Sequence, residues 1–526
     1  MRQLRAPAVL LILGFYGATV QAAVIGSALI PETTANRHGL TREWFVQAEV
    51  DRSRGEIDHA VIDGEQVFVQ TDRAILQAFD AKTGKTQWLR QLGNPNYPSM
   101  RPGVGHDWVV AVNGSRVYVI NRYNGALLYE QELRGAPGAG AAVGRQRAYV
   151  PMIDGKMLAY PITLRVDPEE ESVRAQRPAA AGAPEAAAEA AFGAPGDAAA
   201  GFEPAAPADA ALGGIAPSVP VVGAEAPSGI STEGAEDLRR AGLRLEQEVP
   251  PPLSCSSMGR GMVQPLVIRD EETMEMMAWA TDRGYLSFGL LDFSSSPRLS
   301  IKYRLQTAGI VQVPPVALPA QQPTDVGIVY VACVEGYVYA VEDRGARVLW
   351  RYSTGNPIYA PMARVQNRLF VASETGGMHC LDAVAGKSLW WAPDVTHFIA
   401  MSNDRVYAAA GNRQMVVLNA ANGARIDTIA VPDLSLPVAN VQTDRIFLVS
   451  RNGLVQCLRE IGLREPIAHT TPSVTDQMLT ELLGRGLAPA RADGESAEEA
   501  APADALGPAP AAGGDPFGPP AAGNDF

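Results

Sequence analysis

Short runs of β-branched and aromatic residues recur along the chain, and each is followed within a few residues by glycine or a polar turn. Runs of this length, bounded by turn residues, are typical of β-strands joined as antiparallel meanders. The pattern predicts an all-β protein built from many short strands. The clearest runs are EQVFVQT, SRVYVIN, GIVYVAC, NRLFVAS, DRVYAAA and DRIFLVS.

A longer unit repeats around these strands. Alignment on one glycine makes Gly84, Gly125, Gly386 and Gly423 equivalent, and Gly345 falls one residue early. Gly84 and Gly125 are 41 residues apart, as are Gly345 and Gly386, whereas Gly386 and Gly423 are 37 apart. Strand-rich repeats of this length indicate four-stranded units that bury their apolar faces only against one another, as the blades of a β-propeller do.

The residues of the repeated turn have structural explanations. Glycine can adopt positive φ in a tight turn, and the carboxylates of Asp80 and Asp382 can accept hydrogen bonds from turn amides. The aromatic residue after the turn offers a large flat surface, which we expect to wedge between neighbouring sheets. We therefore predict that this motif is structural rather than catalytic. Its aromatic residues are Trp88, Tyr129, Trp350 and Trp390.

Counting units predicts about eight blades, with seven as the alternative. Two further units are expected between Gly125 and Gly345. The last unit lacks an aromatic outer strand, and we expect the N-terminal segment TREWFVQAEV to supply it and close the ring. Closure removes the exposed sheet edges that otherwise promote aggregation. The blades are expected within residues 40–165 and 241–466.

Two segments have compositions that disfavour folding. Residues 166–240 and 489–526 are rich in Ala, Pro and Gly and poor in aromatic residues, so they bury too little apolar surface to offset chain entropy. We predict a long disordered insertion in the third blade and a disordered tail. Before the tail, the pattern of residues 473–486 predicts one short helix that either packs on the propeller or docks a partner.

The first 22 residues have the features of a secretory signal. Arg2 and Arg5 precede the apolar run APAVLLILGFYGATV, which is shorter than the roughly 20 residues of a membrane span. No cysteine follows the run, which argues against a lipid anchor. We expect an exported protein of the periplasm or cell envelope, with no transmembrane helix in the mature chain.

Charge and side-chain chemistry disfavour several classes of function. The net charge of −13 and the lack of a Lys/Arg cluster disfavour nucleic-acid binding. Three of the four cysteines lie in apolar runs, which favours free thiols over two disulfides, and no Cys-x-x-Cys pair occurs. The histidines form no metal-binding motif. These residues are Cys255, Cys333, Cys380, Cys457, His38, His59, His106, His379, His397 and His469.

The segment RLFVASETGGMHCLDAVAGKSLWW, with its hydrophobic-Asp-Ala-x-x-Gly-Lys-x-x-Trp motif, resembles the PQQ-like β-propeller repeat. Quinoprotein alcohol dehydrogenases and the BamB-like proteins of outer-membrane assembly share this repeat. The resemblance is strong at residues 64–93 and 325–392 and weak in the third, fourth and eighth units. The Asp base, the Glu/Asn/Asp metal site and the vicinal Cys-Cys disulfide of the dehydrogenases have no residue-by-residue match here.

These observations favour an exported, monomeric, non-catalytic propeller, closest to BamB-like proteins, which acts as a scaffold for protein partners in the cell envelope. The BamB resemblance implies a role in outer-membrane protein assembly. We expect no catalytic, cofactor-binding or metal-binding residues. The alternatives are a PQQ-dependent quinoprotein dehydrogenase and a propeller that senses a small ligand or polysaccharide in its channel.

Overall fold

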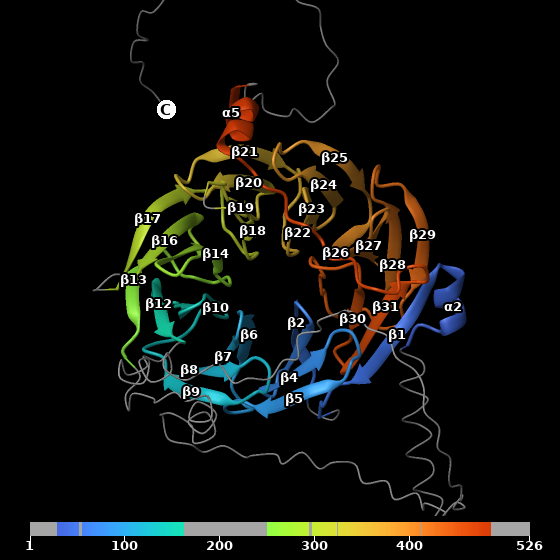
Figure 1. Ribbon diagram of the computed structural model, residues 1–526, viewed down its shortest axis with the longest axis horizontal. Coiled ribbons are helices and arrows are strands. Elements are labelled where there is room, and N and C mark those ends of the chain that lie inside the picture. Colours follow the sequence, from blue (N-terminus) through green and yellow to red (C-terminus); the bar gives the residue numbers. More distant parts are fainter. Residues whose placement is uncertain are drawn as a thin grey trace, which may run out of the picture. The chain divides into compact units, whose positions relative to one another are not determined.

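The computed structural model describes residues 29–51, 55–162, 250–293, 297–322, 324–411 and 413–484. These residues form an eight-bladed β-propeller, which confirms the predicted fold class and the larger of the two blade numbers (Figure 1). The predicted signal at residues 1–22, the insertion at 166–240 and the tail at 489–526 lie outside the described residues.

Seven of the eight sheets contain four antiparallel strands in sequence order, and the first strand of each lies nearest the centre of the ring (Figure 1). Blades 1 to 3 contain β2 (Ile57–Asp63), β3 (Gln66–Thr71), β4 (Ile75–Asp80), β5 (Thr86–Gln91), β6 (Ser99–Val104), β7 (Trp108–Asn113), β8 (Arg116–Asn121), β9 (Leu127–Glu132), β10 (Ala142–Val143), β11 (Arg147–Pro151), β12 (Lys156–Pro161) and β13 (Leu253–Ser256). Blades 4 to 7 contain β14 (Leu266–Asp270), β15 (Met274–Ala280), β16 (Tyr285–Asp292), β17 (Arg298–Gln306), β18 (Val316–Leu318), β19 (Ile328–Ala332), β20 (Tyr337–Glu342), β21 (Val348–Ser353), β22 (Ala363–Val365), β23 (Arg368–Ser373), β24 (Gly377–Asp382), β25 (Ser388–Ala392), β26 (Val395–Met401), β27 (Arg405–Ala410), β28 (Gln414–Asn419) and β29 (Arg425–Ala430).

The eighth blade joins the two ends of the propeller. It contains β30 (Ile446–Val449), β31 (Leu454–Glu460) and, as its outer strand, β1 (Leu40–Gln47). β1 pairs antiparallel with β31, so the prediction that the N-terminal segment closes the ring is confirmed. A short helix, α2 (Glu32–Arg37), precedes β1 and was not predicted.

The middle strands are buried on both faces because every blade is packed between two others. β3 is buried along its whole length, and its valines contact the eighth blade through a cluster that contains Trp44 and Phe447. Similar clusters lie between other successive blades, such as the one that joins Trp350 of blade 5 to Leu369 of blade 6. The core is therefore a ring of interfaces between blades, which explains why a single unit could not fold alone.

The third blade is interrupted in sequence. Its third strand, β12, ends at Pro161, and its outer strand, β13, begins at Leu253, yet Ala159 of β12 pairs directly with Leu253 of β13. The predicted insertion therefore lies in the third blade, as expected.

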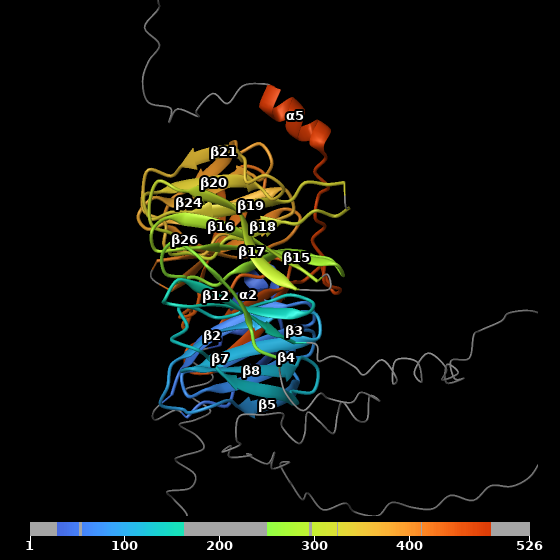
Figure 2. The ribbon, with the colours of Figure 1, turned by 90° about the vertical axis from the view of Figure 1, so that its left-hand side faces the viewer.

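The two faces of the ring differ. The turn face carries the turns between the third and fourth strands, such as residues 80–86, and the connection face carries the links between blades, residues 92–98, 133–141, 257–265, 307–315 and 354–362. The C-terminal segment, residues 463–475, crosses the turn face from blade 8 to blade 5 (Figures 1 and 2). There the amide of Val326 donates to the carbonyl of Val474 at 2.9 Å.

The C-terminal segment leads into helix α5 (Asp476–Gly484), inside the range predicted as helical. Leu479 is buried against the cluster shared by blades 5 and 6, and Asp476 forms an ion pair with Arg344 at 3.2 Å. Met478 remains 45% exposed. Within the described segments, neither helix has the length and apolarity to span a bilayer.

Candidate interaction surface

The repeated turn has the same geometry in several blades. Asp80 Oδ1 accepts hydrogen bonds from the amides of Lys82 and Thr83 at 3.1 and 2.8 Å. The amide of Gly84 donates to the carbonyl of Asp80 at 2.8 Å, with φ of 70° at the glycine. Asp382 and Gly386 repeat this arrangement in blade 6. The aspartates thus satisfy turn amides that have no strand partner.

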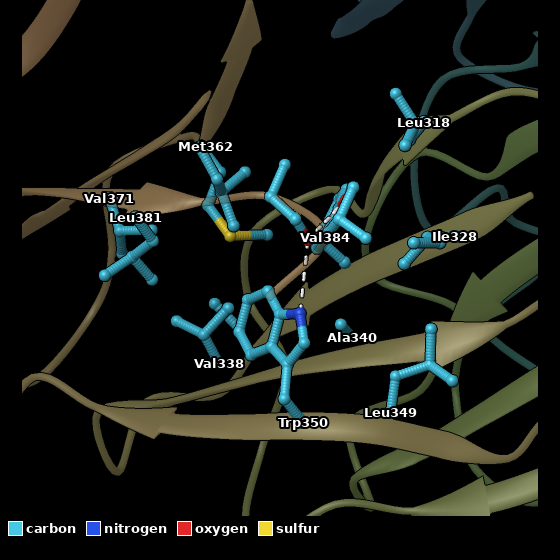
Figure 3. Packing of buried hydrophobic residues seen from close by; sticks show 14 of the residues in the cluster. Leu318, Ile328, Val338, Ala340, Leu349, Trp350, Met362, Val371, Leu381 and Val384 are labelled. Atoms are coloured by element: carbon cyan, nitrogen blue, oxygen red, sulfur yellow. Dashed lines mark hydrogen bonds between the residues drawn. The ribbon is translucent and has the colours of Figure 1, made fainter. Parts of the chain in front are cut away.

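Each motif tryptophan lies flat on the turn glycine of the next blade. A Cβ atom on Gly386 would stand 2.5 Å from the indole of Trp350. The indole Nε1 donates to the carbonyl of Ala383, three residues before the glycine, at 3.1 Å, and Val338, Met362 and Leu381 surround the ring (Figure 3). The same pairing joins Trp88 to Gly125, Trp390 to Gly423 and, across the closure of the ring, Trp44 to Gly84.

Two of the predicted repeat positions behave differently. Tyr129 occupies the register position of a motif tryptophan, opposite Val119, and its hydroxyl donates to the carbonyl of Pro161 in blade 3. Gly345 is not the equivalent of the turn glycine, because Ala346 takes that place with φ of 53°. The backbone amide of Ala346 donates a hydrogen bond to the carbonyl of Glu342 at 3.0 Å. The outer strand of the preceding blade, β17, contains no tryptophan, so the Cβ atom of Ala346 fits at the turn position.

Each motif tryptophan has an aromatic partner in the second strand of its own blade that was not predicted from the sequence. Ring centroids lie 6.0 Å apart in Phe68–Trp88, 5.8 Å in Tyr330–Trp350 and 5.9 Å in Phe370–Trp390. The signal was present, because the aromatic residue occupies the third position of β3, β19 and β23 alike. Aromatic pairs at this distance add stabilisation beyond the area they bury.

The polar junctions between blades were also missed. Arg269 of blade 4 forms an ion pair with the fully buried Asp343 of blade 5 at 2.6 Å. Glu275 of blade 4, also fully buried, accepts hydrogen bonds from the Tyr149 hydroxyl and, at 2.7 Å, from the Gln146 amide of blade 3. Burial raises the pKa of Glu275 above its ordinary value. No local sequence pattern links these residues, because the two members of each pair are far apart along the chain.

The connection face carries most of the exposed apolar side chains that lie on loops. They come from the links between blades and from the turn between β11 and β12, and each is between 40% and 56% exposed. Scattered apolar residues are normal on any surface, but a series on one face is typical of an interaction site. The residues are Tyr97, Ile153, Met258, Met262, Ile310 and Tyr359.

Hydrogen bonds hold these connections in fixed conformations. Ser257, Thr307 and Thr354 occupy equivalent positions and donate to the carbonyls of Gly155, Gly284 and Gly336 at 2.7, 2.8 and 3.0 Å. Each bond ties a link between blades to the turn between the second and third strands of the blade it leaves. The exposed side chains are therefore presented by ordered backbone, which lowers the entropy cost of binding.

Between blades 3 and 4 the connection face is hollowed by a pocket of about 350 Å³. Ile153 and Met258 contribute apolar wall, while Asp154, Arg260 and Asp282 contribute charge. Arg260 and Asp282 form an ion pair at 3.3 Å, and the Arg260 side chain is 64% exposed. A mixed apolar and charged depression of this size suits one or two side chains of a protein partner.

The candidate reactive residues are dispersed. All four cysteines are free thiols, as favoured from the sequence, and burial raises the pKa of Cys255 to about 11. Burial lowers the pKa of His397 to about 4, and His38 pairs with Asp427. Among the residues that the structure describes, no group of three or more His, Cys, Asp or Glu side chains could hold a metal ion.

Comparison with known proteins gives one family match and several structural relatives. A family model described as outer membrane protein assembly factor BamB matches residues 47–165 and 334–459. No curated protein matches the chain. BamB from Moraxella catarrhalis superposes with a TM-score of 0.50 at 11% identity, covering 80% of this chain and 97% of that one.

Two other solved structures are similar at lower scores. The computationally designed Ika8 protein has a TM-score of 0.44 at 9% identity and covers 78% of this chain and 99% of its own. Quinohemoprotein alcohol dehydrogenase from Comamonas testosteroni has a TM-score of 0.46 at 9% identity and covers 81% of this chain and 77% of its own.

The two segments matched by the family model lie on either side of blade 4, in blades 1 to 3 and blades 5 to 8. They contain three of the four Trp–Gly contacts described above, those of Trp88, Trp350 and Trp390, and the structural likeness to BamB supports the same fold. The protein is therefore a β-propeller whose two matched segments are of the PQQ-like repeat type.

Proposed function

We propose that this protein is an exported, non-catalytic scaffold of the cell envelope, which binds protein partners on its connection face. The observation that carries the proposal is the series of exposed apolar side chains held on hydrogen-bonded connections across blades 1 to 6. The match to a model described as outer membrane protein assembly factor BamB supports an envelope partner concerned with outer-membrane proteins.

Binding is the whole mechanism in this proposal. Apolar side chains such as Met262 and Tyr359, each 46% exposed, provide contact area, and the charged rim of the pocket between blades 3 and 4 orients the partner. The propeller changes little on binding, because each blade is fixed by two neighbours. The predicted signal at residues 1–22 directs export, and the two predicted disordered segments act as tethers.

Site-specific cross-linking in intact cells tests the proposal. A photoreactive amino acid replaces Tyr359 on the connection face or, as the matched control, Leu389, which is 45% exposed on the outer strand β25. We expect adducts with a defined envelope protein from position 359 and none from position 389. Equal cross-linking from both positions would contradict the proposal.

Charge substitution in the same surface provides an independent readout. The double variant Met262→Asp/Tyr359→Asp should lose co-purification with the cross-linked partner, because burying an unpaired carboxylate is costly. Leu389→Asp should retain it. Both variants should keep the native melting temperature, since all three side chains are exposed.

The rival enzyme hypothesis has its own test. A quinoprotein dehydrogenase would bind PQQ in a metal-dependent manner and oxidise alcohols with an artificial electron acceptor. We expect titration with PQQ, in calcium and separately in a lanthanide, to give neither metal-dependent binding nor turnover. Turnover by the purified mature chain would replace the scaffold proposal.

A further inference from the structure

A β-bulge interrupts the innermost strand of blade 2. In β6, Met100 pairs with Val112 and Gly103 pairs with Val110, so Arg101 and Pro102 together oppose the single residue Ala111. Bulges bend a strand and redirect a side chain, and they are frequent beside binding sites. Proline suits the position because it has no amide hydrogen to pair. The bulge faces the central channel, since β6 is the strand of blade 2 nearest the centre (Figure 1).

Arg101 lines a pocket of about 280 Å³ between the innermost strands of blades 1 to 4. The remaining wall is mostly apolar and includes Val143, Leu266 and Val267. Gln264 fixes one side of the pocket, because its Nε2 donates to the carbonyl of Ala141 at 2.7 Å. A mostly apolar pocket with two charged side chains, Arg101 and Asp63, has the composition of a site for a small amphipathic ligand.

The guanidinium of Arg101 has no hydrogen-bond or ion-pair partner among the described residues. Most other charges on the innermost strands are neutralised: Asp63, which also lines the pocket, is paired with Arg122 at 2.7 Å. Asp270 lies 3.9 Å from Arg145, and Arg269 is paired with Asp343. Asp58 lies 3.5 Å from His59, but burial lowers the pKa of His59, so this imidazole does not neutralise the carboxylate.

Arg364 is the second arginine of the innermost strands that lacks a carboxylate partner among the described residues. It lies on β22 of blade 6, opposite β6 across the ring, and its Nε is buried without a hydrogen bond (Figure 1). Arg101 is exposed to the solvent of the channel, although the surrounding protein atoms still lower the pKa of its guanidinium.

We propose that the channel pocket binds a small organic oxyanion, a carboxylate or a phosphate monoester, whose charged group pairs with Arg101 and whose apolar body packs on Val143, Leu266 and Val267. A planar guanidinium can form two parallel hydrogen bonds with either oxyanion. The ion pair of Asp63 with Arg122 limits repulsion from the carboxylate in the same wall. This proposal is independent of partner binding on the connection face.

Calorimetric titration at low ionic strength tests the proposal with four probes that share a ring. Benzoate and phenyl phosphate carry the oxyanion, while benzyl alcohol is neutral and benzylamine is cationic. We expect saturable binding of at least one oxyanion and of neither control, and the stronger of the two oxyanions identifies the ligand source. Equal binding of benzyl alcohol, or no saturable binding by any probe, would overturn the proposal.

Substitution of the arginine locates the site. Arg101→Gln should weaken oxyanion binding about tenfold or more, in line with a lost charge-assisted hydrogen bond, and Arg101→Lys should weaken it less. Arg298→Gln, on the outer strand β17, is the matched control and should leave affinity unchanged. Melting temperatures report folding of each variant. Unchanged affinity in a folded Arg101→Gln protein would show that the anion binds elsewhere.

Discussion

Neighbouring blades of this propeller are joined in two chemically different ways. Four junctions place a tryptophan flat on the turn glycine of the next blade, through Trp44, Trp88, Trp350 and Trp390. The junctions from blade 3 to 4, 4 to 5 and 7 to 8 instead use buried or half-buried polar groups. In the last of these, His38 pairs with Asp427, and the Tyr407 hydroxyl donates to Glu460 at 2.8 Å.

The difference explains why only part of the repeat is visible in the sequence. A tryptophan junction needs glycine, because the indole fills the space of a Cβ atom, so both residues recur at fixed spacing. A polar junction needs only complementary groups at some position on each blade. Units three, four and eight, where the repeat is weak, all take part in polar junctions, together with units five and seven. Neighbouring blades are thus held together both where the Trp and Gly motif is present and where it is absent.

The largest expected effect comes from removing a junction tryptophan. Trp390→Ala should lower the free energy of unfolding by about 4 kcal/mol, because it empties a buried site and removes the hydrogen bond to Ala420. Its neighbour Trp391, which is 53% exposed, is the matched control, and Trp391→Ala should cost about 1 kcal/mol or less. Urea unfolding measures both. Similar losses of unfolding free energy in the two variants would mean that the contact of Trp390 with the next blade does not stabilise the ring.

The polar junction should respond differently to single and double substitution. Arg269→Met alone should cost about 3 kcal/mol, because Asp343 would be left buried without its partner. Adding Asp343→Leu should restore part of that loss, since an apolar pair can replace a buried ion pair. Arg451→Met, which breaks the exposed pair with Glu56, is the control and should cost no more than about 1 kcal/mol. A double variant less stable than Arg269→Met would contradict this account.

The turn position offers a reciprocal pair of substitutions. Gly386→Ala should cost about 2 kcal/mol, because the new Cβ atom meets the Trp350 indole at a left-handed φ of 69°. Ala346→Gly, where no tryptophan lies, should change stability by less than about 1 kcal/mol. Chemical denaturation of the two variants decides whether the glycine is required by the indole or by the turn alone. Changes in the free energy of unfolding of equal size in the two variants would indicate that the turn alone requires the glycine.

The smallest effect should be a pH dependence confined to the polar junctions. Because burial raises the pKa of Glu275, the folded protein binds this proton more tightly than the unfolded chain, and stability falls as pH rises through the raised pKa. Glu275→Gln cannot ionise, so its stability relative to the native protein should improve with rising pH. Unfolding curves measured from pH 4 upward test this. Glu132→Gln, at an exposed position of β9, is the control, and its stability should depend on pH in the same way as that of the native protein.

Much of the architecture could be read from local patterns. The alternation of strand runs and the Asp-x-x-x-Gly turn predicted blades, their number and the ring closure through the segment that contains Trp44. These predictions succeed because strand periodicity, and the need for glycine where the backbone is left-handed, are local requirements of the chain. The placement of Gly345 shows the limit, since only the structure reveals that Ala346 occupies the turn position.

The candidate sites were decided by tertiary structure. Met262, Ile310 and Tyr359 are ordinary apolar residues in sequence, and closure of the ring brings their loops to one face. Arg101 likewise has no motif around it, and it becomes a candidate site because a bulge and four innermost strands surround it with apolar wall. The sequence by itself determined the repeated unit, because its turns and strands depend on neighbouring residues. The surfaces and the channel depend on residues hundreds of positions apart, so only the folded ring could define them.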